Sequence, residues 1–230
     1  VPFDPHYRRI VDVLKDGREV EYGFLGVQLG RFDRGLVIEH VSTGTPAAAA
    51  GLVGAGDPDR PRPDRIVAID GLPVRDADDV FFQLAAALAG TKVRLTVTRD
   101  GKDRTVEATL AKSHNPLPAV ASARPPAAFG LRVDYASVLL HQMQKAGDRR
   151  ATEYGLPAGV MVREIDKGSP ADVKLRGPGM GGERWLVTHV DGTAVTTPAE
   201  FYRAAAGKPK VTLKLLDPAD REAAREVVLP

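Results

Sequence analysis

The chain has 230 residues, of which 43% are hydrophobic, so it can form one or two domains, each with a buried core. Its 32 Lys and Arg residues nearly balance 30 Asp and Glu, and this net charge of +2 gives no electrostatic reason to propose nucleic acid as a partner. No apolar stretch approaches the roughly 20 residues that a membrane span requires. Cysteine is absent, which excludes disulfides, thiolate catalysis and cysteine-ligated metal.

Residues 1–21 form the first expected segment. The chain begins Val1-Pro2-Phe3, without Met, and we interpret it as part of a longer protein, so missing targeting signals carry no information on location. An Asp-Pro start at residue 4, followed by apolar residues at helical spacing, predicts a short amphipathic helix that stops at Gly17.

The next stretch, Gly23-Phe24-Leu25-Gly26-Val27-Gln28-Leu29, places glycines on both sides of a Phe-Leu pair and then alternates. Glycine permits positive φ, so such a turn can aim its backbone N–H groups outward. Grouped N–H donors bind a carboxylate, and a free strand edge beside them can add an extended peptide. These residues predict the floor of a peptide-binding groove, with an ordinary hairpin strand after a tight turn as the alternative.

Residues 22–112 continue as five or six strands and two helices. A short helix follows Thr45-Pro46 and ends at Gly51, and a second helix begins at the acids of residues 76–79 and runs to about Ala89. Between them, the Pro- and Gly-rich run Gly54–Pro63 predicts an exposed loop. The expected strands are residues 24–29, 35–41, 66–69 (ended by Asp70-Gly71), 93–98 and 105–110, the last two joined by Asp100-Gly101.

Residues 113–126 contain four prolines and predict a semi-rigid linker. Residues 127–230 then repeat the first unit, with an insertion at 134–157 whose residues 137–145 predict a helix. The same blocks in the same order predict two copies of one domain. The matched blocks are 159–165 with 35–41, 168–171 with 44–47, 190–192 with 69–71, 198–202 with 77–81, 210–215 with 92–97, and 225–229 with 106–110.

These blocks resemble tandem PDZ domains of the circularly permuted bacterial type. The resemblance rests on Phe24–Val27, on the Thr45-Pro46-Ala47 turn before a small-residue helix, and on the strand and turn Asp64–Gly71. It implies an α+β fold, mostly β, with two PDZ-like partly open barrels or sandwiches, each capped by two helices. The N-terminal helix and its approach to Tyr22–Val27 are similar to the join between the protease domain and the first PDZ domain of HtrA/DegP-type serine proteases.

In that family, PDZ grooves bind C-termini or exposed hydrophobic segments of client proteins, present them to the protease domain, and take part in activation and assembly. The resemblance implies client polypeptides and the protease domain of the same chain as partners, and leaves open a homo-oligomer formed through the parent protein. It implies no cofactor, and a periplasmic or cell-envelope location. A non-catalytic PDZ scaffold or adaptor for protein assembly is the alternative function.

Carried over by position, the family's site residues fall into two grooves. In the first groove, Phe24, Leu25, Gly26 and Val27 would hold the terminal carboxylate and the strand edge, while Leu29, Phe81 and Leu84 would wall the side-chain pocket. Val80 is expected in the core, and Phe81 lies either in the pocket wall or in the core.

The second groove would use Phe129, Gly130, Leu131, Val133 and Tyr202, with Pro198 and Ala205 beside Tyr202 on the helix. Because the insertion 134–157 could cover or reshape this groove, peptide binding by the second copy is open. A contact role, toward the first domain or another subunit, is the other interpretation.

Catalytic and metal-binding patterns are missing from the sequence. There is no Gly-x-Ser-x-Gly nucleophile elbow, and the five histidines lack metal-ligand spacing. The run Gly177–Gly182 is glycine-rich but lacks the Lys and Ser or Thr of a phosphate loop. We therefore expect no catalytic or metal site in this chain. The resemblance to HtrA/DegP-type proteases implies a parent protein that is a trypsin-like serine endopeptidase.

Overall fold

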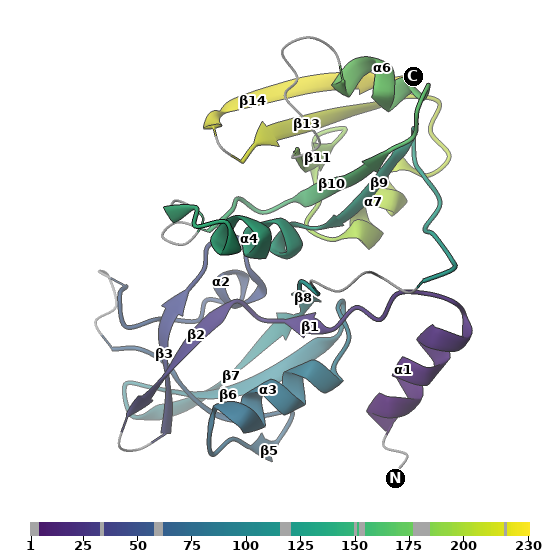
Figure 1. Ribbon diagram of the computed structural model, residues 1–230. Coiled ribbons are helices and arrows are strands. Elements are labelled where there is room, and N and C mark those ends of the chain that lie inside the picture. The colour runs from purple at the N-terminus through teal and green to yellow at the C-terminus, as the bar shows by residue number, and fades with distance from the viewer. Residues whose placement is uncertain are drawn as a thin grey trace. The chain divides into compact units, whose positions relative to one another are not determined.

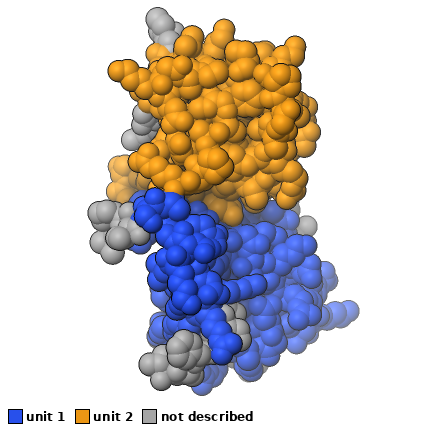
Figure 2. All heavy atoms as spheres, turned by 90° about the vertical axis from the view of Figure 1, so that its right-hand side faces the viewer, with its two compact units in different colours: residues 1–123, 152–155 blue, residues 124–151, 156–230 orange. Residues whose placement is uncertain are grey.

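The computed structural model describes residues 5–32, 35–57, 62–115, 121–149, 151, 155–176, 185–218 and 220–230. It divides into two compact units: unit 1 comprises residues 1–123 and 152–155, and unit 2 comprises residues 124–151 and 156–230 (Figure 1, Figure 2). The predicted loop, linker and insertion run partly outside the described residues, and Gly177–Gly182 lies wholly outside them. No described helix is both long and apolar enough to cross a bilayer.

Unit 1 is built on an open antiparallel sheet with the strand order β2-β3-β4-β6-β7, in which β2 is an edge strand. Strand β5 pairs with β4, and β1 pairs with β8 in a separate two-stranded ribbon. The elements are α1 (Pro5–Lys15), β1 (Gly23–Phe24), β2 (Val27–Phe32), β3 (Gly35–Val41), α2 (Pro46–Ala49), β4 (Arg65–Ile69), β5 (Leu72–Pro73), α3 (Ala77–Ala86), β6 (Lys92–Arg99), β7 (Lys102–Thr109) and β8 (Ala111–Lys112).

The core of unit 1 follows from strand alternation. In β6, Val93, Leu95 and Val97 are at most 1% exposed, whereas the residues between them face solvent in whole or in part. Helix α3 covers this core with Val80, as predicted, and with Leu84. Each such side chain contributes roughly 1.5–3 kcal/mol by leaving water.

Helices α2 and α3 start where the sequence predicts, because a side chain caps each one. The Thr45 hydroxyl accepts from the Ala48 N–H at 3.4 Å, and the Asp76 carboxylate accepts from the Asp79 N–H at 2.9 Å. Helix α3 ends at Ala86 rather than near Ala89. The next residue, Ala87, adopts an extended conformation, and its carbonyl accepts from the Gly23 N–H at 2.8 Å.

Unit 2 repeats this topology, with the strand order β9-β10-β11-β13-β14 and β12 paired with β11. The predicted duplication therefore holds at the level of the sheet, and the α+β, mostly β fold class is confirmed. The elements are β9 (Leu131–Tyr135), α4 (Ala136–Lys145), β10 (Val160–Ile165), α6 (Pro170–Leu175), β11 (Leu186–Val190), β12 (Thr193–Ala194), α7 (Pro198–Ala205), β13 (Val211–Asp217) and β14 (Asp220–Leu229).

The inserted helix α4 packs on the outer face of the unit 2 sheet. Met161, Leu186 and Leu216 form a small hydrophobic cluster with α4, whereas their chain neighbours Val187 and Leu215 belong to the main core. Successive strand residues point to opposite faces, so α4 and α7 lie on opposite sides of the sheet. The described helix α4 of the insertion therefore lies on the face of the sheet opposite to the one that α7 covers.

The turns at Asp70 and Asp191, which match in the two units, have the same conformation. Both residues have φ of 48° and precede a glycine. Each carboxylate accepts from the backbone of a neighbouring strand in the sheet: Asp70 from the Arg94 N–H of β6 at 2.8 Å, and Asp191 from the Thr212 N–H of β13 at 2.7 Å. These bonds tie each turn to the neighbouring strand of its sheet, β6 in unit 1 and β13 in unit 2.

Candidate functional site

The turn at Leu25–Val27 is held by two backbone hydrogen bonds that determine where its N–H groups point. The Leu25 carbonyl accepts from the Ala47 N–H at 2.9 Å, and the Gly26 carbonyl accepts from the Ser42 N–H at 3.1 Å. In a trans peptide the C=O and the following N–H point in opposite directions. The N–H groups of Gly26 and Val27 therefore point away from these inward bonds.

Glycine is required at the centre of this turn. Gly26 has φ of +91°, and a Cβ there would collide with the Thr45 side chain. The sequence therefore permits a turn in which consecutive N–H donors are grouped, an arrangement that suits an anion such as a carboxylate.

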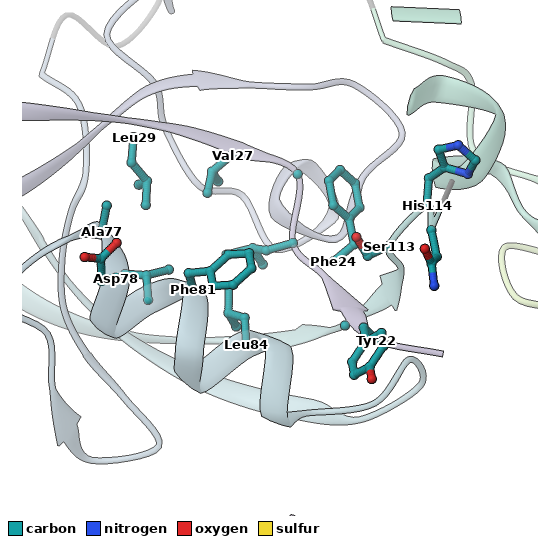
Figure 3. Close-up of a pocket in the computed structure, with 15 residues that line it drawn as sticks. Tyr22, Phe24, Val27, Leu29, Ala77, Asp78, Phe81, Leu84, Ser113 and His114 are labelled. Carbon is teal, nitrogen blue, oxygen red and sulfur yellow. The ribbon is translucent and has the colours of Figure 1, made fainter. Parts of the chain in front are cut away.

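A groove of about 700 Å³ runs between this turn and edge strand β2 on one side and helix α3 on the other. Figure 3 shows Val27 and Leu29 directed from the strand toward Phe81 and Leu84 on the helix. We call this the first groove. It is lined by Tyr22, Gly23, Phe24, Leu25, Gly26, Val27, Leu29, Ala77, Asp78, Val80, Phe81, Leu84, Ser113, His114 and Asn115, which include all seven residues that the sequence placed there.

The two aromatic residues on α3 have different positions. Phe81 lines the groove and is 68% exposed, so it belongs to the rim and not to the core. Its neighbour Phe82 is equally exposed and packs edge-on against it at 6.1 Å between ring centroids, but it is not a lining residue. Leu25 and Leu84 are buried and form the floor.

Sequence reasoning missed both ends of the groove. Ala77 lies four residues before Phe81 and seven before Leu84, so helical spacing could have identified it. Ser113 and His114 carry no such signal, because they reach the groove through the pairing of β8 with β1 and a bond from the Ser113 N–H to the Tyr22 carbonyl at 2.8 Å.

The three acids that begin α3 have separate roles. Asp76 caps the helix. Asp79 forms a bidentate ion pair with Arg75, and the hydrogen bonds from Arg75 lower the pKa of the Asp79 carboxyl. Asp78 is exposed and lines the groove beside Ala77 (Figure 3). The first groove is therefore apolar along its length, with one acidic side chain at the end near the start of α3.

Unit 2 builds the same turn with other residues. Gly130 has φ of +83°, its carbonyl accepts from the Asp166 N–H at 2.8 Å, and the Phe129 carbonyl accepts from the Ala171 N–H at 3.2 Å. Leu131 and Val133, the next predicted groove residues, are buried in the main core of the unit.

The helix that faces this turn carries Tyr202, whose hydroxyl accepts from the Val133 N–H at 3.3 Å. The side chain is half-buried and packs edge-on against Phe201 at 5.3 Å between centroids. Burial raises the pKa of the Tyr202 phenol, so the group stays protonated at neutral pH. Pro198 begins this helix and Ala205, near its end, is buried.

Among the described residues, no group of three or more His, Asp or Glu side chains is placed to hold a metal ion.

Comparisons with known proteins agree with this geometry. The model of the PDZ domain family matches residues 23–110. A probable periplasmic serine endoprotease, DegP-like, from Pseudomonas fluorescens is 30% identical over 86% of this chain and 40% of its own length. Its counterpart from Pseudomonas fulva is 28% identical over 87% of this chain and 41% of its own length.

Among solved structures, the HtrA-type protease AlgW with decapeptide aligns over 48% of this chain and 35% of its own, at 23% identity and a TM-score of 0.39. The chain spans about 40% of the length of each of the two Pseudomonas relatives. Residues 23–110 are a PDZ domain, and over most of its length the chain is homologous to the DegP-like serine endoproteases of the HtrA family.

Proposed function

We propose that unit 1 binds client polypeptides by adding their C-terminal residues as an extra strand beside β2. The observation that carries this proposal is the turn Leu25–Val27, whose inward carbonyls direct two N–H groups away from the core at one end of an apolar groove. Strand addition supplies main-chain hydrogen bonds with little sequence preference, and pockets for alternate side chains give specificity.

In this proposal the terminal carboxylate accepts from the N–H groups of Gly26 and Val27. The last side chain enters the pocket between Leu29, Phe81 and Leu84, which favours Val, Leu, Ala or Phe. Affinity is in the micromolar range, because the groove is short and open to solvent. Exposed hydrophobic segments within a client would use the same strand edge without the carboxylate contact.

We further propose that this binding regulates a serine endoprotease. The relatives named above are endoproteases described as periplasmic, and this chain matches less than half of their length. Unit 1 would then hold client polypeptides for a protease domain elsewhere in the same protein, in the periplasm or cell envelope.

The test is a titration of the chain with a pool of peptides that carry free C-termini, followed by mapping of amide shifts for one peptide that binds. Shifts on Phe24–Leu29 and Ala77–Ala86 are expected. Shifts confined to other elements, or none at all, would overturn the groove.

An amidated copy of the same peptide tests the carboxylate contact. It is expected to bind about tenfold more weakly, because charge-assisted hydrogen bonds are the stronger ones. Equal binding of the two forms would show that the turn does not hold a carboxylate and would favour internal segments as ligands.

A further inference from the structure

The two units present different aromatic residues to the same place beside an edge strand. Matching Gly26 with Gly130 aligns Leu29 in β2 with Val133 in β9, and both strands lie at the edge of their sheets. Matching the buried Val80 with the buried Phe201 aligns Phe81 with Tyr202. A phenylalanine in unit 1 thus stands where unit 2 has a tyrosine.

The tyrosine hydroxyl makes a contact that phenylalanine cannot make. It accepts from the Val133 N–H at 3.3 Å, across 69 residues of sequence. This N–H lies on the side of β9 that faces α7, so it is the donor that an added strand would use. Phe81 has no acceptor atom, and in unit 1 no side chain at this helix position can satisfy the corresponding donor of Leu29.

We propose that Tyr202 closes the second groove by occupying the main-chain donor of Val133, so that unit 2 accepts an extended peptide only after this side chain moves. The Tyr202 hydroxyl oxygen takes the place of a peptide carbonyl. The inference rests on the proposed function of unit 1 only for the kind of ligand, which is an extended polypeptide.

The surroundings of Tyr202 favour the closed arrangement. Its ring packs against the main core of unit 2 and against Phe201, so both the ring and the hydroxyl are held. Helix α7 itself is fixed by a capping box in which Thr197 and Glu200 exchange hydrogen bonds. A peptide must therefore break a hydrogen bond and displace a packed ring before it can pair with β9.

The hydrogen bond is tested without any ligand by amide exchange in the full chain. The Val133 amide is expected to exchange at least about tenfold faster in Tyr202→Phe than in the unchanged protein. The Leu131 amide, which donates to the Ala128 carbonyl at 2.8 Å, is the internal control and should not change. An unchanged Val133 rate would overturn the proposal.

The closure is tested with a ten-residue peptide that ends in Ala-Val-Val and carries a free carboxylate. In the unchanged chain, the amide chemical shifts of residues 131–133 are expected not to change at peptide concentrations that saturate unit 1. In Tyr202→Ala the same amides should shift, with apparent affinity raised at least about tenfold. Shifts there in the unchanged chain, or none in a folded Tyr202→Ala, would overturn the proposal.

The two proposals fail in distinguishable ways. If residues 24–29 do not respond to the peptide, the proposed function of unit 1 fails, while the exchange rate of the Val133 amide still decides whether Tyr202 holds it. If Tyr202→Ala does not fold, the comparison with Tyr202→Phe still decides the same point, because that substitution removes only the hydroxyl.

Discussion

Unit 1 and unit 2 share one frame, by which we mean the sheet, the glycine turn and the facing helix, but they differ in the side chains beside the edge strand. Both have a glycine of positive φ at the centre of the turn. The Gly26 carbonyl accepts from the N–H of Ser42, which follows β3, and the Gly130 carbonyl accepts from the N–H of Asp166, which follows β10. Both bury a helix residue at the matched position, Val80 in one unit and Phe201 in the other. The next residue on each helix differs: Phe81 is 68% exposed, whereas Tyr202 is half-buried and bonded to the strand.

This difference shows that the frame and the groove have separate determinants. The frame depends on backbone conformation and on apolar burial, which two quite different sequences can satisfy. In our proposal, the state of the groove depends on the side chain that follows the buried helix residue, Phe81 or Tyr202, and on whether it carries a hydroxyl. Resemblance to a binding domain therefore predicts the fold of both units more securely than it predicts binding by both.

The cores of the two units also differ at one matched position, and this difference gives the largest expected effect. Asp64 is fully buried, forms a bidentate ion pair with Arg99 at 2.6 Å, and accepts from the Val53 N–H. Unit 2 has Trp185 at the matching position, buried in its hydrophobic core. Removing one partner of a buried ion pair leaves the other uncompensated and typically costs about 3–5 kcal/mol.

Asp64→Ala is therefore expected to lower the free energy of unfolding of unit 1 by about 3 kcal/mol. The unfolding of each unit can be followed separately, because Trp185 is the single tryptophan and reports on unit 2, while amide signals report on unit 1. Arg75→Ala, which breaks an exposed ion pair with Asp79, is the control and should change little. An unchanged unit 1 transition in Asp64→Ala would show that the ion pair does not support the fold.

Much of the architecture was accessible from the sequence because its signals are local. The turns, the glycines and the repeated blocks predicted the α+β class and the duplicated topology. The Thr45-Pro46 turn and the acids of residues 76–79 predicted where α2 and α3 begin. All seven residues expected at the first groove line it, because they lie on two contiguous segments whose periodicity is readable.

What the sequence did not predict depends on contacts between distant segments. The bond between Val133 and Tyr202 joins a strand and a helix 69 residues apart, and no local pattern shows that the hydroxyl reaches the strand. The face chosen by α4 depends on Met161, Leu186 and Leu216, three residues from three strands that become one surface only in the sheet. Ser113 and His114 reach the groove through strand pairing.

A second prediction tests the open groove. Leu84→Asp places a carboxylate in the apolar pocket, where the last side chain of a peptide would otherwise be buried. Binding of a peptide that ends in Val should fall about 100-fold, because an unpaired charge in an apolar site is costly. Titration by fluorescence anisotropy measures this change.

Phe82→Asp is the matched control for Leu84→Asp. It introduces the same charge on the same helix at an exposed residue that does not line the groove, so peptide affinity should be retained. If affinity survives Leu84→Asp, or if both variants lose it equally, the groove is wrongly placed.

A third prediction transfers the closed arrangement of unit 2 to unit 1. Phe81→Tyr supplies the hydroxyl that unit 2 has at this position, so it should compete with a peptide for the Leu29 N–H. Peptide affinity is expected to fall about fivefold, in keeping with one neutral hydrogen bond. Phe82→Tyr adds the same hydroxyl outside the groove and should bind as the unchanged chain does. Equal affinities for both variants would mean that the hydroxyl alone does not separate the two units.

The smallest expected effect concerns the acidic end of the first groove. A peptide that pairs with β2 antiparallel advances about 3.4 Å per residue, and alternate side chains face the same way. The third residue from its end therefore points toward α3, about 7 Å beyond the terminal side chain, where Ala77 and Asp78 line the groove. Unit 2 has Pro198 and Ala199 at the matching positions and offers no charge there.

A peptide with Lys at its third-last position should accordingly bind unit 1 about threefold more tightly than the same peptide with Gln, as expected for an exposed ion pair. Asp78→Asn should remove this preference, and so should added salt, since exposed pairs are screened. Glu107→Gln changes the net charge equally on exposed strand β7 and should leave the preference intact. A preference that persists in Asp78→Asn would show that the long-range field of the unit, and not this side chain, selects the cationic peptide.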